Sequence, residues 1–263
     1  MAKLFNKIRK TLISEKPSVS RTSNYLKYAI GEIVLVVIGI LIALQINTWN
    51  EERKNRLLED DYYCILLEDL NQDVLEINKQ LEINELRIKT SNKFIALLQK
   101  PSFTQFEVMQ AMLGSISKTT FTFQPTKAAF EDLKSSGNLG LLKDLTIKNK
   151  LVAYYTNLEG LTDVIDANSD SSINAFFNYQ KDFSEIGWQY LPFVSSEIDT
   201  TIIDVKALTP IDYPSKELKK QLMSDAVMFL GTSSRKKDLY LIMAKEINSM
   251  QTILSEKCNI IND

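Results

Sequence analysis

The longest apolar run of this chain lies near its N-terminus and predicts one transmembrane helix. Residues 33–44 are all apolar apart from Gly39. A helix over residues 28–49 is about 31 Å long, close to the hydrocarbon thickness of a bilayer. Tyr28 and Trp49 stand at its two ends, where aromatic rings settle at the membrane surface. A cleaved signal peptide is the alternative, but the run starts late and no small-x-small cleavage site follows it.

After this run, hydrophobic residues recur every seven positions and predict a helix that continues to about Lys100. No proline lies between Pro17 and Pro101 to interrupt it. One set of seam positions is Leu67, Val74, Leu81, Ile88 and Ile95, and the companion set is Leu70, Ile77, Asn84, Ser91 and Leu98. Two interpretations stay open. The seam packs inside the chain's own bundle, or it pairs with a second chain as a coiled coil whose register the polar Asn84 and Ser91 fix.

The rest of the chain also shows helical periodicity, so the sequence predicts an all-α fold. Further helices are expected near residues 104–117, 126–136 and 144–168, and from about Ser233 onward. Gly137 suits the left-handed residue that follows the second of these helices. The last helix carries an apolar stripe of Tyr240, Ile247, Leu254 and Ile261, with Met243 and Met250 between them. This stripe is expected to pack antiparallel against the first long helix. Residues 119–123 alternate, and an extended lead-in to Pro125 is preferred over a strand.

The distribution of charge predicts which way the protein points. Residues 1–27 hold seven basic side chains and one acid, whereas the segment after the apolar run has no basic excess. Basic flanks stay in the cytoplasm. We therefore expect a bacterial inner-membrane protein with residues 1–27 in the cytoplasm and residues 50–263 in the periplasm. The basic segment either lies flat on the anionic cytoplasmic leaflet or forms a solvated tail.

Composition argues against nucleic-acid binding and against catalysis. The formal net charge is −2, and because residues 1–27 carry +6 and Glu32 carries −1, residues 50–263 carry −7. An acidic domain of this kind does not attract nucleic acid. The chain contains no histidine, which removes the commonest general base and the commonest ligand of catalytic zinc. We therefore expect no enzyme activity, no catalytic or metal-binding residues and no cofactor.

Small and polar residues in the apolar segment are candidate helix-packing or membrane-interface positions. Gly31, Gly39 and Ala43 share a face on which two helix backbones can approach closely, which favours a homodimer or small oligomer. Glu32 lies about one turn inside the cytoplasmic boundary. Its carboxylate either snorkels to the membrane surface, or transfers a proton or pairs with a partner protein. The positions at the outer boundary, which bond across helices or to headgroups, are Gln45, Asn47 and Trp49.

The two cysteines of the chain are candidates for a disulfide. Cys64 and Cys258 both fall in the part expected to be periplasmic, an oxidising compartment in most envelopes. If the last helix runs back along the first, these two positions approach each other. The alternative is two separately buried thiols, because free cysteine is often buried.

An aromatic-rich stretch over residues 173–193 is a candidate partner surface. Its members are Phe176, Phe177, Tyr179, Phe183, Trp188, Tyr190 and Phe193. Aromatic anchors dominate contact surfaces, so the stretch suits a groove for a peptide, a lipid or a protein. The alternative is an aromatic cap on the membrane-distal end of the helical bundle.

The run GEIVLVVIGILIALQIN at residues 31–47, followed by WNEE at residues 49–52, resembles the membrane segment of a known family. That family consists of single-pass proteins of Bacteroidota with a domain of unknown function, and the likeness extends to residues 129–139. It implies an inner-membrane anchor with a helical periplasmic domain, and it supplies no catalytic residues. We expect a scaffold or interaction module of an envelope complex, whose partners are the lipid bilayer, a membrane or periplasmic protein and copies of itself. The alternative is a ligand-sensing bundle that signals through a membrane partner.

Overall fold

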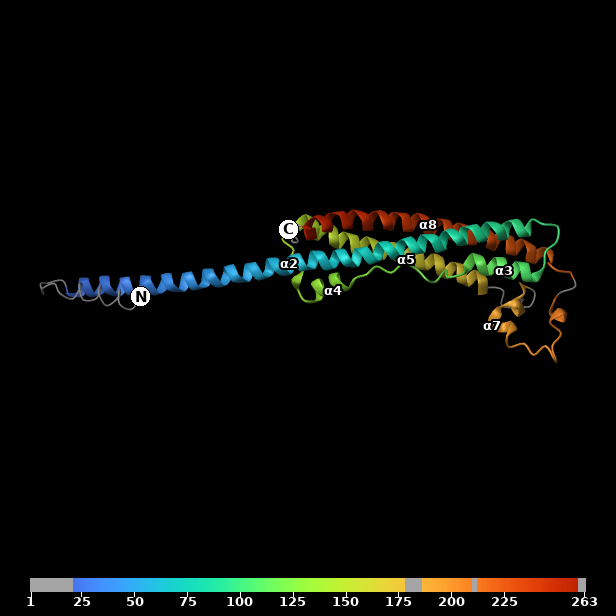
Figure 1. Cartoon of the computed structure of the whole chain (residues 1–263), viewed down its shortest axis with the longest axis horizontal. Coiled ribbons are helices and arrows are strands. Elements are labelled where there is room, and N and C mark those ends of the chain that lie inside the picture. The colour runs from blue at the N-terminus through green and yellow to red at the C-terminus, as the bar shows by residue number, and fades with distance from the viewer. Residues whose placement is uncertain (1–20, 178–185, 210–211, 260–263) are drawn as a thin grey trace. The chain divides into compact units, whose positions relative to one another are not determined.

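The computed structural model of this protein describes residues 21–177, 186–209 and 212–259 (Figure 1). These residues form helices joined by turns and extended segments, with no strand among them, which confirms the all-α fold. The elements are α2 (Arg21–Leu98), α3 (Gln105–Ile116), α4 (Ala128–Ser135), η1 (Asn138–Gly140), α5 (Leu145–Phe177), η2 (Trp188–Tyr190), α7 (Pro192–Ser195), η3 (Val205–Leu208) and α8 (Lys216–Asn259). The chain divides into two compact units, Met1–Leu57 and Leu58–Asp263.

The first unit, where it is described, is the N-terminal part of α2. This helix contains a stretch that is long and apolar enough to cross a membrane, near the N-terminus. The large apolar side chains from Ile33 to Leu44 are exposed rather than packed in a protein core. An exposed surface of this composition is typical of a helix that lipid or another helix covers.

The second unit is a helical bundle in which α8 runs antiparallel to α2. Three pairs of residues show the direction: Cys64 with Cys258, Asn71 with Gln251 at 2.6 Å, and Glu85 with Lys237 at 2.9 Å. Residue numbers rise along α2 as they fall along α8, as the heptad stripes of the two segments predicted. The helix α5 also runs antiparallel to α8, and the three helices lie side by side in Figure 1.

The heptad seam of α2 is covered by the chain's own helices. Leu66, Leu70 and Ile77 of α2 lie buried in one core with Tyr154 and Leu158 of α5 and with Met243, Ile247 and Leu254 of α8. The structure therefore supports the intrachain interpretation of the seam. The companion set from Leu70 to Leu98 is buried, and the first set from Leu67 to Ile95 is half-buried. The amide of Asn84 donates to the Ser233 carbonyl at 2.6 Å, so its partner is α8 of the same chain.

Helices α5 and α8 are both longer than their periodicity predicted. The expected helix over residues 144–168 extends to Phe177, and the last helix begins at Lys216 rather than near Ser233. Serines lie at both places, and serine favours caps and turns over helix interiors. In α5, however, the Ser169, Ser171 and Ser172 hydroxyls donate to the carbonyls four residues earlier, so the serines are accommodated within the helix.

The segment between α3 and α5 contains the turn chemistry that the sequence predicted. Gly137 follows α4 with φ 75°, the left-handed conformation expected at this position. Thr119 and Thr120 lie in a turn and residues 121–127 have no regular secondary structure, so the strand alternative is wrong and an irregular segment leads to Pro125. A side-chain cap on α4 comes from another helix, because the Asp69 carboxylate of α2 accepts the Ala129 N–H at 3.1 Å.

A polar layer separates two hydrophobic cores inside the bundle. The first core surrounds Leu70 and Ile247, and the second surrounds Phe94 and Phe229. Between them each long helix buries polar side chains instead. We call these residues the polar layer: Asn84, Arg87 and Ser91 of α2, Thr119 of the turn after α3, Ser169 and Ser172 of α5, and Ser233 and Lys236 of α8.

Candidate functional site

The small-residue face predicted in the membrane segment is open in this structure. A methyl group added at Gly31 or Gly39 meets no atom within 4 Å. Ala43 is likewise exposed, one turn beyond Gly39. This face therefore has room for the backbone of another helix. Near the C-terminal end of the apolar segment the amide of Asn47 donates to Glu51 at 3.0 Å, and Gln45 and Trp49 are exposed.

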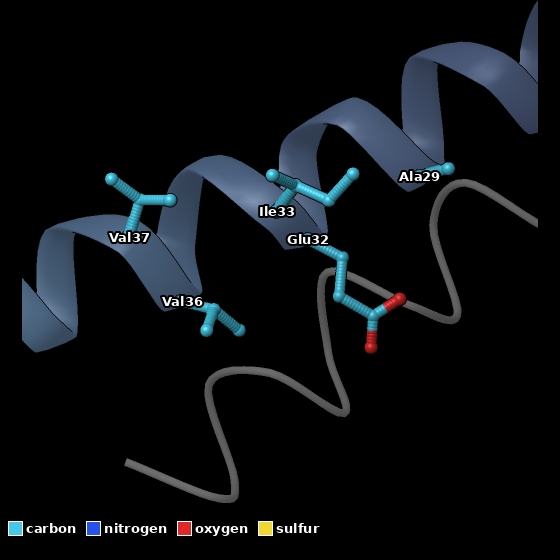
Figure 2. Close-up of a pocket in the computed structure, with 5 residues that line it drawn as sticks. All are labelled: Ala29, Glu32, Ile33, Val36 and Val37. Atoms are coloured by element: carbon cyan, nitrogen blue, oxygen red, sulfur yellow. The ribbon is translucent and has the colours of Figure 1, made fainter.

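Glu32 lies in a small pocket on the apolar part of α2, lined also by Ala29, Ile33, Val36 and Val37 (Figure 2). Its carboxylate points away from the helix in the figure. The other described lining residues are aliphatic, and they supply neither a hydrogen-bond donor side chain nor a cation. Among the described lining residues Glu32 is therefore the one polar side chain, whereas several convergent polar groups usually orient a small ligand.

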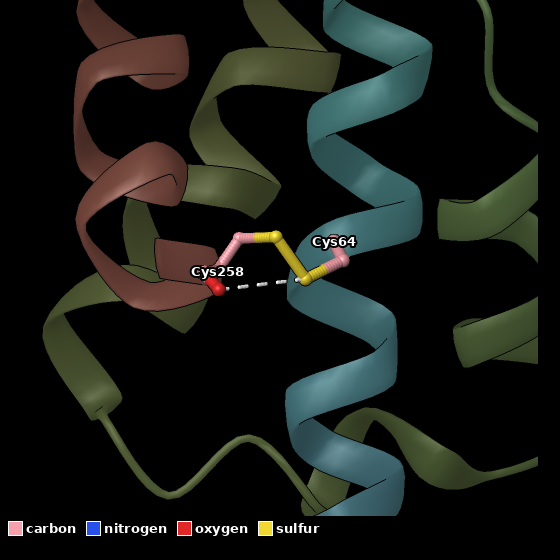
Figure 3. Close-up of a disulfide and its surroundings, with 2 residues drawn as sticks. All are labelled: Cys64 and Cys258. Carbon is pink, nitrogen blue, oxygen red and sulfur yellow. Dashed lines mark hydrogen bonds between the residues drawn. A yellow bond between two sulfur atoms is a disulfide. The ribbon is translucent and has the colours of Figure 1, made fainter. Parts of the chain in front are cut away.

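The two cysteines are joined to each other in the structure. Cys64 of α2 and Cys258 of α8 form a disulfide with 5.0 Å between their Cα atoms (Figure 3). The bond ties the last turn of α8 to α2 and closes a loop of 194 residues. It links the two helices whose heptad stripes pack together, and it lies at one end of the first hydrophobic core.

The aromatic-rich stretch forms a cluster that is part core and part surface. Phe176 is buried and stacks on Trp188 with 5.7 Å between ring centroids. Phe177 and Phe193 contact Trp188 from the exposed side, and Tyr190 meets Phe106 of α3 edge to face. Tyr179 and Phe183 lie outside the described residues. Phe176 and Trp188 belong to the second core, whereas Phe193 is 66% exposed. The use of this cluster as a partner surface stays a prediction.

Three carboxylates of α2 bind backbone N–H groups of the segment from Thr126 to Lys143. Asp73 accepts from the Thr126 N–H at 2.8 Å, and Glu59 accepts from the Lys143 N–H at 2.7 Å. Asp69 caps α4, as described above. Asp73 also accepts from the Tyr154 hydroxyl at 3.3 Å. These acids were not predicted as functional residues, because acidic residues along a helix usually indicate a face exposed to solvent.

The charge of Asp73 is held in a buried position. Burial raises the pKa of this carboxyl above its usual range, although the Thr126 N–H and the Tyr154 hydroxyl act in the opposite direction. The pKa of the Tyr154 hydroxyl is raised as well, first by burial and then by the Asp73 charge. The group therefore serves as a hydrogen-bond acceptor that positions the chain around α4.

Replacing Asp73 with alanine is expected to lower the free energy of unfolding by about 2–4 kcal/mol, because two buried donors lose their acceptor. Urea unfolding of the purified protein measures this change. Asp73→Asn keeps one acceptor oxygen and removes the buried charge, so its cost is expected to be about 1 kcal/mol. Glu68→Ala removes an exposed acid from the same helix and is the matched control. Equal effects of Asp73→Ala and Glu68→Ala contradict the positioning role.

The polar layer holds two buried cations. The Lys236 ammonium is 0% exposed and donates to the Thr119 carbonyl at 2.9 Å, the Thr119 hydroxyl at 3.0 Å and the Ser169 hydroxyl at 2.6 Å. Burial, and next the Arg87 charge, lower the pKa of Lys236 to about 7. Arg87 is 4% exposed and donates to the Ser233 hydroxyl at 3.3 Å, and burial lowers its pKa to about 10.

The contact between Ser169 and Lys236 has the composition of a serine–lysine catalytic pair, but its surroundings favour a structural role. Ser169 lies within α5, is 3% exposed, and donates its own proton to the Ile165 carbonyl at 2.9 Å. A nucleophile must reach its substrate, and this hydroxyl is enclosed by the bundle. Among the described residues there is also no cluster of three or more cysteine or acidic side chains that could hold a metal ion.

A family model described as a family of unknown function (DUF6090) matches residues 32–181. This range covers more than half of the chain, from Glu32 in α2 to just beyond α5, and leaves α8 outside. No curated protein and no solved structure matches the chain. The family assignment therefore comes with no annotated activity or site. The chain belongs to the family of unknown function DUF6090.

Proposed function

We propose that this protein is a non-catalytic, membrane-anchored scaffold or interaction module of a bacterial envelope complex. The observation that carries the proposal is the exposed apolar surface of α2, which is long enough to span a bilayer and which the rest of the described chain does not bury. Such a surface needs lipid or another membrane helix to cover it. The helical bundle then acts on the side of the membrane opposite to residues 1–27.

The orientation rests on two independent features. Residues 1–27 carry the basic excess that stays in the cytoplasm of bacteria. The disulfide between Cys64 and Cys258 belongs to the second unit, and such bonds persist in oxidising compartments such as the periplasm. Both features support an inner-membrane protein with its N-terminus in the cytoplasm and its bundle in the periplasm.

The interaction role is supported by surfaces that suit protein partners. The open face at Gly31 and Gly39 suits a second transmembrane helix, because backbones approach closely there. The exposed side of the aromatic cluster, at Phe177 and Phe193, suits a periplasmic partner.

Affinity purification from membranes in a mild detergent tests the proposal. A stoichiometric membrane or periplasmic protein is expected to co-purify with the full chain, and Phe193→Ala or a bulky residue at Gly39 is expected to reduce its yield. Leu41→Phe, on the opposite side of the membrane helix from Gly39, is the control. Recovery of the chain alone after crosslinking in intact cells contradicts the scaffold function.

Self-association through the membrane face gives a separate prediction. Gly39→Ile is expected to reduce a crosslinked dimer in native membranes several-fold, because the added side chain keeps the helix backbones apart. The variant inserts normally, since isoleucine is more apolar than glycine. Leu41→Phe adds bulk to the other side and is expected to leave the dimer unchanged. If wild type and Gly39→Ile give the same crosslinked species, this face is not the interface.

A ligand-sensing bundle is the second candidate function, and the polar layer favours it. Buried polar groups between two hydrophobic cores of a helical bundle are a place where a small molecule can change helix packing. A sensor of this kind also needs a membrane partner to pass the signal on. A melting temperature that rises with one metabolite, in a protein that purifies without a partner, supports the sensor over the scaffold.

A further inference from the structure

The polar layer places two positive charges in the bundle interior without a matching negative charge in contact. Arg87 and Lys236 come from α2 and α8, and the Ser233 hydroxyl that Arg87 contacts lies on the same helix as Lys236. Among the described residues, neither cation forms an ion pair with a carboxylate, and both donate only to hydroxyl and carbonyl oxygens. Buried charges are ordinarily paired, because removal from water costs several kcal/mol.

Hydrogen-bonding capacity in this layer is also left over. The Nε of Arg87 and the hydroxyl of Ser91 are buried and have no hydrogen-bond partner among the described residues. They are four residues apart on α2, so they lie on the same face of the helix. Buried donors in native proteins are nearly always satisfied, by the protein, by water or by a bound group. The carboxylates of Asp166 and Asp170 raise the pKa of Lys236 from a distance, but neither forms an ion pair with Lys236 or Arg87. Two unused donors beside two cations that have no carboxylate in contact are the features expected of an anion site.

We propose that a small monovalent anion of the chloride type binds in the polar layer, between α2 and α8. The Arg87 guanidinium and the Ser91 hydroxyl donate hydrogen bonds to it, and the Lys236 ammonium supplies a second positive charge. The anion offsets the repulsion between the two cations, which adds to the effect of burial in lowering the pKa of Lys236. This site does not depend on the anchoring function, because all of its residues belong to the bundle.

The burial of the layer selects the kind of anion. Arg87, Ser91 and Lys236 are at most 4% exposed, so a ligand here must give up nearly all of its hydration. Desolvation costs more for a divalent ion than for a monovalent one, so chloride, bromide or nitrate is favoured over sulfate or phosphate. The side-chain oxygen of Asn84 is also buried without a described hydrogen-bond partner, and because it is an acceptor it suits a water rather than the anion.

The test is the thermal stability of the full chain in detergent, measured in sodium chloride and in sodium gluconate at equal ionic strength. Gluconate is too large to enter the layer. At a chloride concentration about ten times the dissociation constant, the melting temperature is expected to rise by about 3–6 °C over gluconate. Bromide is expected to give a similar rise. Broadening of the chloride NMR line by the protein, reversed by bromide, reports binding directly.

Variants connect the effect to the site. Arg87→Gln and Ser91→Ala are expected to remove at least half of the chloride-dependent shift, and Lys236→Met, which keeps the side-chain volume, is expected to do the same. Lys237→Gln removes an exposed cation from the neighbouring position of α8 and should leave the shift unchanged. Circular dichroism confirms that each variant is folded. Equal melting temperatures in chloride and gluconate, together with an unbroadened chloride line, overturn the proposal, as does an equal loss in Lys237→Gln.

Discussion

Replacing Cys64 and Cys258 with serine is expected to lower the free energy of unfolding of the bundle by about 3–5 kcal/mol. The bond closes a loop of 194 residues, and loop closure restricts the unfolded chain more when the loop is long. It also holds the last turn of α8 against α2, where the first core ends. Urea unfolding of the oxidised wild type and of the double variant measures the difference.

A reductant provides the matched control for this prediction. Wild type treated with dithiothreitol should unfold at the same urea concentration as the double serine variant, because both lack the covalent link. The double variant itself should not respond to the reductant. If the oxidised wild type unfolds at the same urea concentration as the variant, the disulfide makes no contribution to stability.

A double arginine substitution in the middle of the apolar segment, Ile38→Arg with Ile42→Arg, is expected to abolish membrane insertion. Each arginine at the centre of a transmembrane helix costs about 2.5–3.5 kcal/mol on insertion scales, and the two lost isoleucines add to this. The protein should move from the membrane fraction to the soluble or aggregated fraction. Because the bundle then stays in the cytoplasm, Cys64 and Cys258 should remain reduced.

Carbonate extraction of membranes, followed by thiol alkylation and mass spectrometry, measures both consequences. Ile38→Leu with Ile42→Leu is the control, since it changes the same positions without adding charge. A double arginine variant that stays in the carbonate-resistant fraction with its disulfide formed contradicts the assignment of this segment as the anchor.

Much of the fold could be predicted because long helices with one buried face have apolar residues at a regular spacing. The seven-residue spacing from Leu67 to Leu98, and that from Tyr240 to Leu254, gave the two helices and their antiparallel pairing. The same spacing did not tell whether the seam faced the chain's own helices or another chain. That question depends on which helix lies nearest in space, and the core around Leu70 and Ile247 answers it.

The ends of α5 and α8 were missed for a local reason. Serine and threonine favour caps and turns, and both predicted limits, near Asn168 and Ser233, lie beside runs of these residues. In the structure, hydroxyls in these runs bond to carbonyls of the preceding turn or to the polar layer, as Thr232 does with the Phe229 carbonyl at 3.2 Å. Burial of Ser169 and Ser233 in the bundle thus overrides their intrinsic preference.

The polar contacts of the bundle were the least predictable part of the candidate sites. Asn84 and Ser91 stood out because they interrupt an apolar seam, whereas Arg87 lay among ordinary charged residues. The carboxylates of Asp69 and Asp73 accept hydrogen bonds from backbone N–H groups. Nearly every residue has such a group, so the sequence does not indicate which one a carboxylate binds. The spacing of Ser233, Lys236 and Tyr240 was one available signal, because it places the three side chains on one face of α8. Since Tyr240 belongs to the predicted apolar stripe, this spacing indicates that Lys236 is buried beside it.

The most direct test of the central claim, an anchored bundle on the periplasmic side, is a pair of reporter fusions after Asp263. Alkaline phosphatase folds only when exported, and green fluorescent protein exported through the general secretion pathway does not become fluorescent. A periplasmic bundle should give an active phosphatase fusion and a dark fluorescent-protein fusion, both in the membrane fraction. A fluorescent fusion with an inactive phosphatase fusion places the bundle in the cytoplasm and contradicts the proposed orientation and function.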